Sequence, residues 1–118
     1  MTPFFKSFIY ALNGIKFSLK QRNMKVLVAC ALLTLLCGFL LKINVTEWCI
    51  ILICIGNVLA LETVNSSIES LVNLVEPNHN PLAGKIKDLS AGAVFIFSII
   101  SAVIGIMIFG KYILDLLS

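Results

Sequence analysis

Four polar side chains recur at helical spacing in the middle of this 118-residue chain, directly after the apolar run 48–61. They stand at positions i, i+3, i+7 and i+11: Glu62, Asn65, Glu69 and Asn73. At about 100° per residue, these positions share one stripe of a helix. The preceding run is apolar enough for a membrane helix, so the stripe begins at the edge of a bilayer. Ionisable groups there usually mark a functional site.

A lysine and a third carboxylate follow a short loop. Lys87 and Asp88 stand at the start of the third apolar segment. Taken singly, Lys87 could be a snorkelling lysine and Asp88 a first-turn carboxylate favoured by the helix dipole. Together with the stripe they are typical of a Mg²⁺-nucleotide site, where carboxylates hold the metal and lysine neutralises phosphate. Neither a G-x-x-x-x-G-K-[ST] loop nor a kinase-type glycine-rich loop is present. These residues alone therefore do not identify the protein as a kinase.

The composition indicates a lipid environment. Hydrophobic residues make up 59% of the chain and charged residues 13%, against roughly 45–50% and about 25% in soluble domains. All four cysteines lie inside apolar runs without a C-x-x-C pair, and we interpret them as small hydrophobic residues. The basic residues are dispersed and fit no nucleic-acid-binding motif.

The sequence therefore predicts an all-α membrane protein with one domain, 1–118. Three transmembrane helices are expected over 24–43, 45–75 and 82–117, the second with a cytoplasmic extension. Asn44 or Thr46 is expected to cap the second of them. The loop before the third contains two prolines, two asparagines and a glycine, and Pro81 is expected in the first turn of the next helix.

Residues 2–22 form a different kind of segment. Apolar residues recur on one side at helical spacing, and Lys6, Asn13, Lys16 and Lys20 lie on the other. This pattern predicts an amphipathic helix in the membrane interface. A helix simply packed on the bundle is the alternative, and the two are compatible.

The distribution of lysine and arginine predicts the orientation. Five basic residues precede the first span, and Lys85 and Lys87 follow the second loop. The other side has only Lys42 and Lys111. The N-terminus and the polar stripe are therefore expected on the cytoplasmic side, where ATP is available.

Over essentially its whole length, the chain resembles the prokaryotic diacylglycerol kinase family of small integral-membrane lipid kinases. The resemblance rests on residues 62–69 (ETVNSSIE), on 86–94 (IKDLSAGAV) and on 11–15 (ALNGI) with Arg22-Asn23. Residues 43–48 are more similar to the undecaprenol kinase branch. The resemblance implies a homotrimer in the bacterial inner membrane, ATP as phosphoryl donor, Mg²⁺, and undecaprenol or diacylglycerol as acceptor.

The resemblance also implies roles for individual residues. Glu62 would be the catalytic base, Asn65 would orient it or contact phosphate, and Glu69 would bind the metal. The remaining residues implied to contact ATP are Tyr10, Asn78, His79, Asn80, Lys87 and Asp88.

The chain departs from the family pattern at two positions. Gln21 stands where the family usually has a second metal-binding glutamate, and Asn73 where it usually has aspartate. An amide oxygen is a poorer Mg²⁺ ligand than a carboxylate, so weaker metal binding is expected. A catalytically weak membrane scaffold is therefore the alternative to a lipid kinase. An ion relay is disfavoured, because one helix carries the whole stripe and no inverted repeat is visible.

Overall fold

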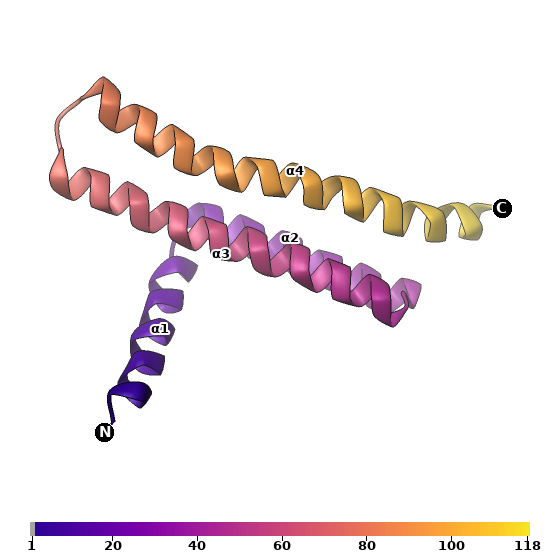
Figure 1. Ribbon diagram of the computed structural model, residues 1–118. Coiled ribbons are helices and arrows are strands. Elements are labelled where there is room, and N and C mark those ends of the chain that lie inside the picture. Colours follow the sequence, from indigo (N-terminus) through magenta and orange to yellow (C-terminus); the bar gives the residue numbers. More distant parts are fainter. Residues whose placement is uncertain (1) are drawn as a thin grey trace.

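The computed structural model describes residues 2–118, and within that range it contains four helices and no strand. The helices are α1 (Pro3–Leu19), α2 (Arg22–Leu41), α3 (Val45–Val75) and α4 (Pro81–Leu117) (Figure 1). The last three are long and apolar enough to cross a membrane. The predicted all-helical fold with three spans is therefore confirmed.

The helix ends differ slightly from the predicted ranges. α2 begins at Arg22 rather than at residue 24, because Gln21 stands at its N-cap position with extended backbone. Arg22 and Asn23 belong to the helix although they lie outside its apolar run, and hydropathy marks only the part that can cross hydrocarbon. The bounds of α3, Val45–Val75, agree with the expected range 45–75.

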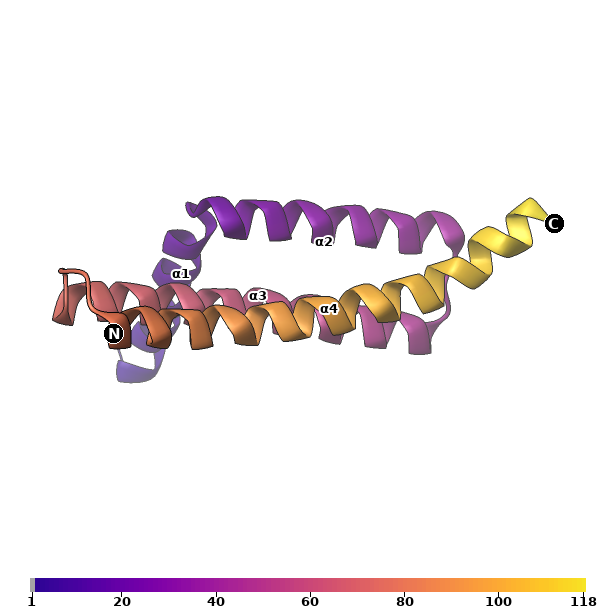
Figure 2. The same ribbon diagram turned by 90° about the horizontal axis from the view of Figure 1, so that it is seen from above.

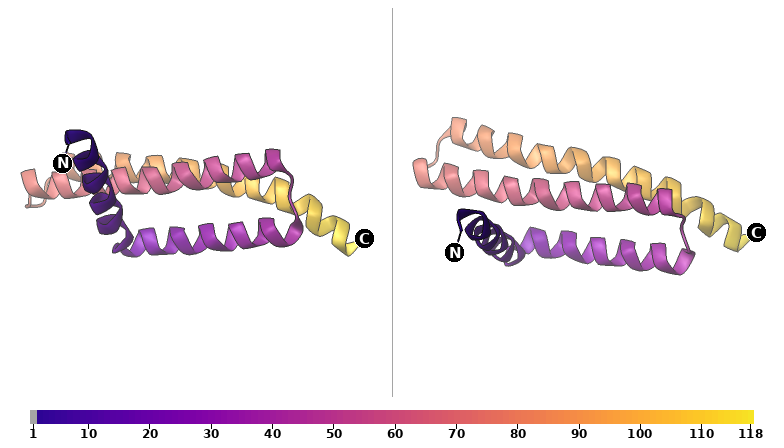
Figure 3. Two further views of the ribbon diagram at one scale, coloured as in Figure 1. Left: turned by 90° about the horizontal axis from the view of Figure 1, so that it is seen from below. Right: turned by 60° about the horizontal axis from the view of Figure 1, so that its bottom comes forward.

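The three long helices run antiparallel to their neighbours in sequence, and α3 contacts both α2 and α4 (Figure 2). The α3–α4 loop, the start of α2 and the end of α1 all lie toward one end of the bundle (Figure 3). α1 runs across the direction of the long helices (Figure 1). If those helices cross a membrane, α1 is oriented to lie along its surface, with its apolar side chains exposed.

Side-chain caps fix where α3 and α4 begin. The Asn44 side chain accepts a hydrogen bond from the Glu47 backbone at 2.9 Å, and the Glu47 carboxylate accepts one from the Asn44 backbone at 3.0 Å. This reciprocal capping box makes Asn44, and not Thr46, the cap of α3. At α4, Asn80 Oδ1 accepts from the Leu82 backbone at 2.9 Å, and Pro81 occupies the first turn.

The turn between α2 and α3 is a Schellman motif closed around a glycine. Lys42 adopts the left-handed conformation with φ of 55°, and the Ile43 backbone donates to the Gly38 carbonyl at 3.2 Å. Ile43 and the indole of Trp48 then cover Gly38. A Cβ on Gly38 would lie 2.8 Å from Trp48 Cη2, so only glycine lets the two helices pack this closely.

The lengths of α2 and α3 place the polar stripe at the membrane boundary. At about 1.5 Å per residue, the 20 residues of α2 span about 30 Å, the thickness of the hydrocarbon core. The 31 residues of α3 span about 46 Å. α3 therefore continues about 15 Å beyond the hydrocarbon if α2 just crosses it.

We predict that Gly38→Ala destabilises the fold by about 1–3 kcal/mol, because the added methyl overpacks the contact with Trp48. Thermal unfolding in detergent measures this effect. Gly56→Ala is the matched control, since no atom lies within 4 Å of its Cβ position. Equal melting temperatures for the two variants would contradict the role of this contact.

Candidate active site

The polar stripe becomes progressively more exposed along α3. Glu62 and Asn65 are each only 4% exposed, Glu69 is partly buried, and Asn73 is exposed. The two inner residues lie within the part of α3 that runs beside α2, whereas Asn73 lies beyond it. The side chains on this face of α3 thus change from the buried carboxylate of Glu62 to the exposed amide of Asn73 over about three helical turns.

Asn65 has an incompletely paired side chain. Its Nδ2 donates to Glu69 Oε1 at 3.5 Å, a long hydrogen bond. Its Oδ1 is buried and has no partner among the described residues. Buried polar atoms are nearly always paired in native proteins, and each exception calls for an explanation. An acceptor directed into a site of this kind is free for a ligand to satisfy.

The connection between α1 and α2 is fastened to the same part of α3 by two side-chain hydrogen bonds. Ser66 Oγ donates to Gln21 Oε1 at 2.8 Å, and the hydroxyls of Ser18 and Thr63 are 3.1 Å apart. Gln21, a predicted metal ligand, therefore contacts α3 at Ser66, which is four residues from Glu62 and three from Glu69 in the sequence. Ser18, Thr63 and Ser66 did not figure in the sequence-based site, although the matching i, i+3 spacing of the two pairs is a usable signal.

Lys87 reaches the outer end of the stripe. Its ammonium donates a hydrogen bond to Asn73 Oδ1, which links α4 to α3. Asn73 is neutral, so this contact places no opposite charge beside the Lys87 ammonium group. The asparagine that departs from the family pattern thus orients the lysine without neutralising it.

A hollow of about 610 Å³ opens beside this pair, and we name it the loop hollow. Residues from the end of α3, the α3–α4 loop and the start of α4 line it. They include five residues of the sequence-predicted site: Asn78, His79, Asn80, Lys87 and Asp88. Tyr10 is not among them, and it lies exposed on α1. Asn73 is 11 residues beyond Glu62, about 16 Å along the helix, so within one chain the loop hollow and the inner carboxylate are the two ends of an elongated site.

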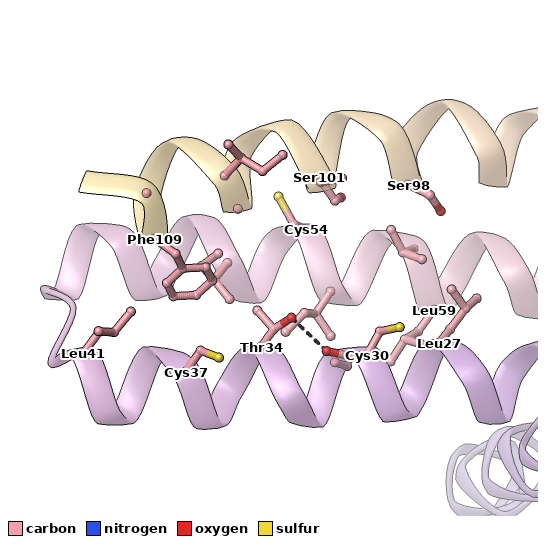
Figure 4. A pocket seen from close by; sticks show the side chains of 18 of the residues that line it. Leu27, Cys30, Thr34, Cys37, Leu41, Cys54, Leu59, Ser98, Ser101 and Phe109 are labelled. Carbon is pink, nitrogen blue, oxygen red and sulfur yellow. Dashed lines mark hydrogen bonds between the residues drawn. The ribbon is translucent and has the colours of Figure 1, made fainter. Parts of the chain in front are cut away.

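A second hollow, of about 690 Å³, lies between α2, α3 and α4 (Figure 4). Its walls are apolar apart from side chains such as Thr34, Ser98 and Ser101, and cysteines are its only titratable residues. Thr34 donates to the Cys30 carbonyl on its own helix at 2.8 Å. This apolar hollow offers no carboxylate, imidazole or ammonium group, so the groups suited to acid–base and metal chemistry are those of the stripe.

Hard oxygen donors gather around Glu62, as a magnesium ion would need. The carboxylates of Glu62 and Glu69, the unpaired carbonyl of Asn65 and the carbonyl of Gln21 lie within two turns of α3. Residues 2–118 contain no cluster of three His, Cys, Asp or Glu side chains. The donor set therefore suits Mg²⁺ but relies on two carboxylates supplemented by amides, and ligand phosphates and water would have to complete the shell.

The fold is that of a small multi-pass membrane protein with buried acidic and amide side chains on one of its long helices. The sequence profile of the family described as prokaryotic diacylglycerol kinase matches residues 9–109. The chain belongs to this family. The match includes every residue of the sequence-predicted site.

The relatives are lipid kinases by name. The undecaprenol kinase of Bacillus subtilis (strain 168) is 44% identical over 110 residues, covering 92% of this chain and 89% of that protein. The diacylglycerol kinase of Helicobacter pylori (strain ATCC 700392 / 26695) is 27% identical over 113 residues, covering 95% and 85%. No solved structure gave a significant match.

These findings indicate that the protein is a lipid kinase, as the sequence predicted. They do not favour the alternative of a catalytically weak scaffold.

We predict that Asn65→Leu raises thermal stability while lowering turnover about 100-fold. The change removes a buried carbonyl whose unsatisfied state costs about 1–3 kcal/mol, and it also removes the group proposed to contact the reactants. Melting temperature and phosphate transfer measure the two effects.

Asn57→Leu is the control, because Asn57 lies on the same helix and donates only to the Ile53 carbonyl of its own helix at 2.8 Å. Full turnover in Asn65→Leu would show that Asn65 is not part of the active site. A lower melting temperature would mean that its carbonyl is satisfied.

Proposed function

We propose that this protein transfers the γ-phosphoryl group of ATP to the hydroxyl of undecaprenol at the cytoplasmic face of the bacterial inner membrane. The observation that carries the proposal is the buried Glu62 beside the unpaired Asn65, at the depth where α2 begins. Undecaprenol is preferred over diacylglycerol because the relative named for it is 44% identical and the one named for diacylglycerol 27%.

Glu62 is proposed as the general base. Its burial shields it from bulk water, and its depth would match that of a lipid hydroxyl at the membrane boundary. It accepts the hydroxyl proton as the lipid oxygen bonds to the γ-phosphorus. The bond between that phosphorus and the β,γ-bridging oxygen breaks, and ADP leaves.

The nucleotide is proposed to bind along the outer part of the stripe. Lys87, held by Asn73, supplies positive charge to the phosphates. Asp88 and the loop residues Asn78, His79 and Asn80 surround the loop hollow, where ribose and base would bind. Tyr10 on the surface helix is proposed as a further contact.

Glu69 and Gln21 are proposed to hold Mg²⁺, with the Asn65 carbonyl available beside them. The ion, when bound, supplies charge neutralisation for the transferring phosphoryl group.

The active unit is proposed to be a homotrimer, as the family resemblance implies. The elongated distance between Glu62 and the loop hollow supports this, because a neighbouring chain would bring a second set of site residues closer. The exposed apolar faces of α2 and α4 leave room for such contacts.

We predict that Glu62→Gln lowers phosphate transfer by about 10²–10⁴-fold while the fold is kept, because the amide cannot accept the hydroxyl proton. Purified protein in detergent with ATP and Mg²⁺ is offered undecaprenol and diacylglycerol side by side, and undecaprenol is expected to react faster. Asp115→Asn, which removes an exposed carboxylate near the end of α4, is the control. Activity of Glu62→Gln equal to wild type would exclude Glu62 as the base.

We predict that Gln21→Glu lowers the Mg²⁺ concentration needed for half-maximal activity severalfold. A carboxylate can still accept the Ser66 hydrogen bond and adds a charge beside Glu69. A magnesium titration, together with metal binding measured by calorimetry, tests this. Gln21→Ala is expected to raise the Mg²⁺ concentration needed for half-maximal activity. An unchanged titration curve in both variants would place residue 21 outside the metal shell.

A further inference from the structure

A second polar cluster lies at the end of the bundle opposite the candidate site, where the proposed function does not use it. Glu47 is only 6% exposed, yet it carries a carboxylate. Lys111 Nζ lies 2.6 Å from Glu47 Oε2, and Oε1 accepts hydrogen bonds from the Tyr112 hydroxyl and from the Asn44 backbone. The donors come from the turn before α3 and from α4, so Glu47 joins the α2–α3 turn to α4.

Polar contacts of this kind determine how α4 lies along α3. Among residues 2–118, side-chain hydrogen bonds and ion pairs join these helices only at two places: Glu47 with Lys111 and Tyr112, and Asn73 with Lys87. The remaining contacts are apolar. In lipid, apolar faces have no hydrophobic drive to associate, so packing and hydrogen bonds must set the position of one helix on the other.

The end at Glu47 is also the better packed of the two. The buried residues Ile43, Ile51 and Ile108 form a cluster there, and Tyr112 packs against it. At the other end, Asn73 is exposed, and Val94, the buried residue in the first half of α4, is not part of such a cluster. α4 is therefore joined to the rest of the bundle by an apolar cluster, an ion pair and a hydrogen bond at one end, and by the Lys87 hydrogen bond at the end that carries the candidate site.

The two links agree in spacing along both helices. Lys87 and Lys111 are 24 residues apart on α4, about 36 Å, and Glu47 and Asn73 are 26 residues apart on α3, about 39 Å. Because α4 is one uninterrupted helix, fixing Lys111 against Glu47 fixes the axial position of Lys87 at the far end.

We propose that Glu47, Lys111 and Tyr112 form a register clamp that positions Lys87 and Asp88 for the nucleotide across the full length of the bundle. This inference rests on the proposed function of Lys87 and Asp88. The clamp residues are positioning residues, since Lys111 lies about 36 Å from Lys87 along α4 and Glu47 about 22 Å from Glu62 along α3.

The first test is a kinetic comparison of full-length variants in detergent. Glu47→Gln and Tyr112→Phe weaken the clamp without large changes of shape, and Lys111→Arg preserves it. We expect the KM for ATP to rise about fivefold in Glu47→Gln and less in Tyr112→Phe, with kcat changed less than about twofold. Lys111→Arg and the control Asp115→Asn are expected to keep the wild-type KM.

A clamp that only stabilises the fold would lower the melting temperature and leave the KM for ATP unchanged. An unchanged KM in both Glu47→Gln and Tyr112→Phe therefore overturns the proposal. If Glu47→Gln does not fold, the test is the KM for ATP of Tyr112→Phe compared with that of Lys111→Arg. Equal values in these two variants then overturn the proposal.

The second test does not depend on kinase activity. Amide hydrogen exchange of residues 82–88 is expected to be faster in Glu47→Gln, or in Tyr112→Phe if that variant alone folds, but not in Asp115→Asn. Unchanged exchange in this segment overturns the clamp whatever the activity. If the wild-type protein has no kinase activity but residues 82–88 still exchange faster in the clamp variants, the proposed function is refuted and the clamp is retained.

Discussion

The pairing of α2 with α3 sets where the polar stripe lies along the bundle. α2 is about one hydrocarbon thickness long, and it is fastened to α3 at both ends. Gly38 packs under Trp48 at one end, and Gln21 accepts the Ser66 hydrogen bond at the other. Since the two helices are matched over the first 22 residues of α3, whatever follows Ser66 on α3 must extend beyond the membrane core. A longer or shorter α2 would shift the stripe into water or into lipid.

This boundary suits a reaction between a lipid and a water-soluble donor. Glu62 and Asn65 lie on the shielded side, where a lipid hydroxyl can arrive laterally and electrostatic interactions are strong. Lys87 and the loop hollow lie on the wet side, where a nucleotide can arrive from solution. The helical stripe connects the two sides within one helix, so a single rigid element carries the proposed base and the proposed metal-binding carboxylate at a constant separation.

The sequence predicted what depends on one helix at a time. Periodicity placed the stripe residues on one face of α3, hydropathy located the three spans, and Asn44 and Pro81 were recognisable as features of helix starts. Contacts between helices could not be obtained in this way, because they depend on how far each helix is rotated and shifted against the next. The Ser66 hydrogen bond to Gln21 is one example and the ion pair of Lys111 with Glu47 another. In the sequence, Lys111 was only one basic residue near the C-terminus, and Glu47 only a residue of the short connection before the second span.

Comparing the two ends of α3 separates a structural polar cluster from a functional one. Glu47 and Asn65 are both buried, and both are polar residues on the same membrane helix. Glu47 receives a backbone N–H, a hydroxyl and an ammonium group, so nothing remains for a ligand to supply. The Asn65 carbonyl receives no donor, and its amide reaches Glu69 only over a long hydrogen bond. Leaving a buried carbonyl unpaired costs about 1–3 kcal/mol, and a fold that pairs Glu47 fully could have paired Asn65 as well. The difference is understandable if a reactant completes the coordination of Asn65 in the working enzyme, whereas Glu47 completes a contact between helices.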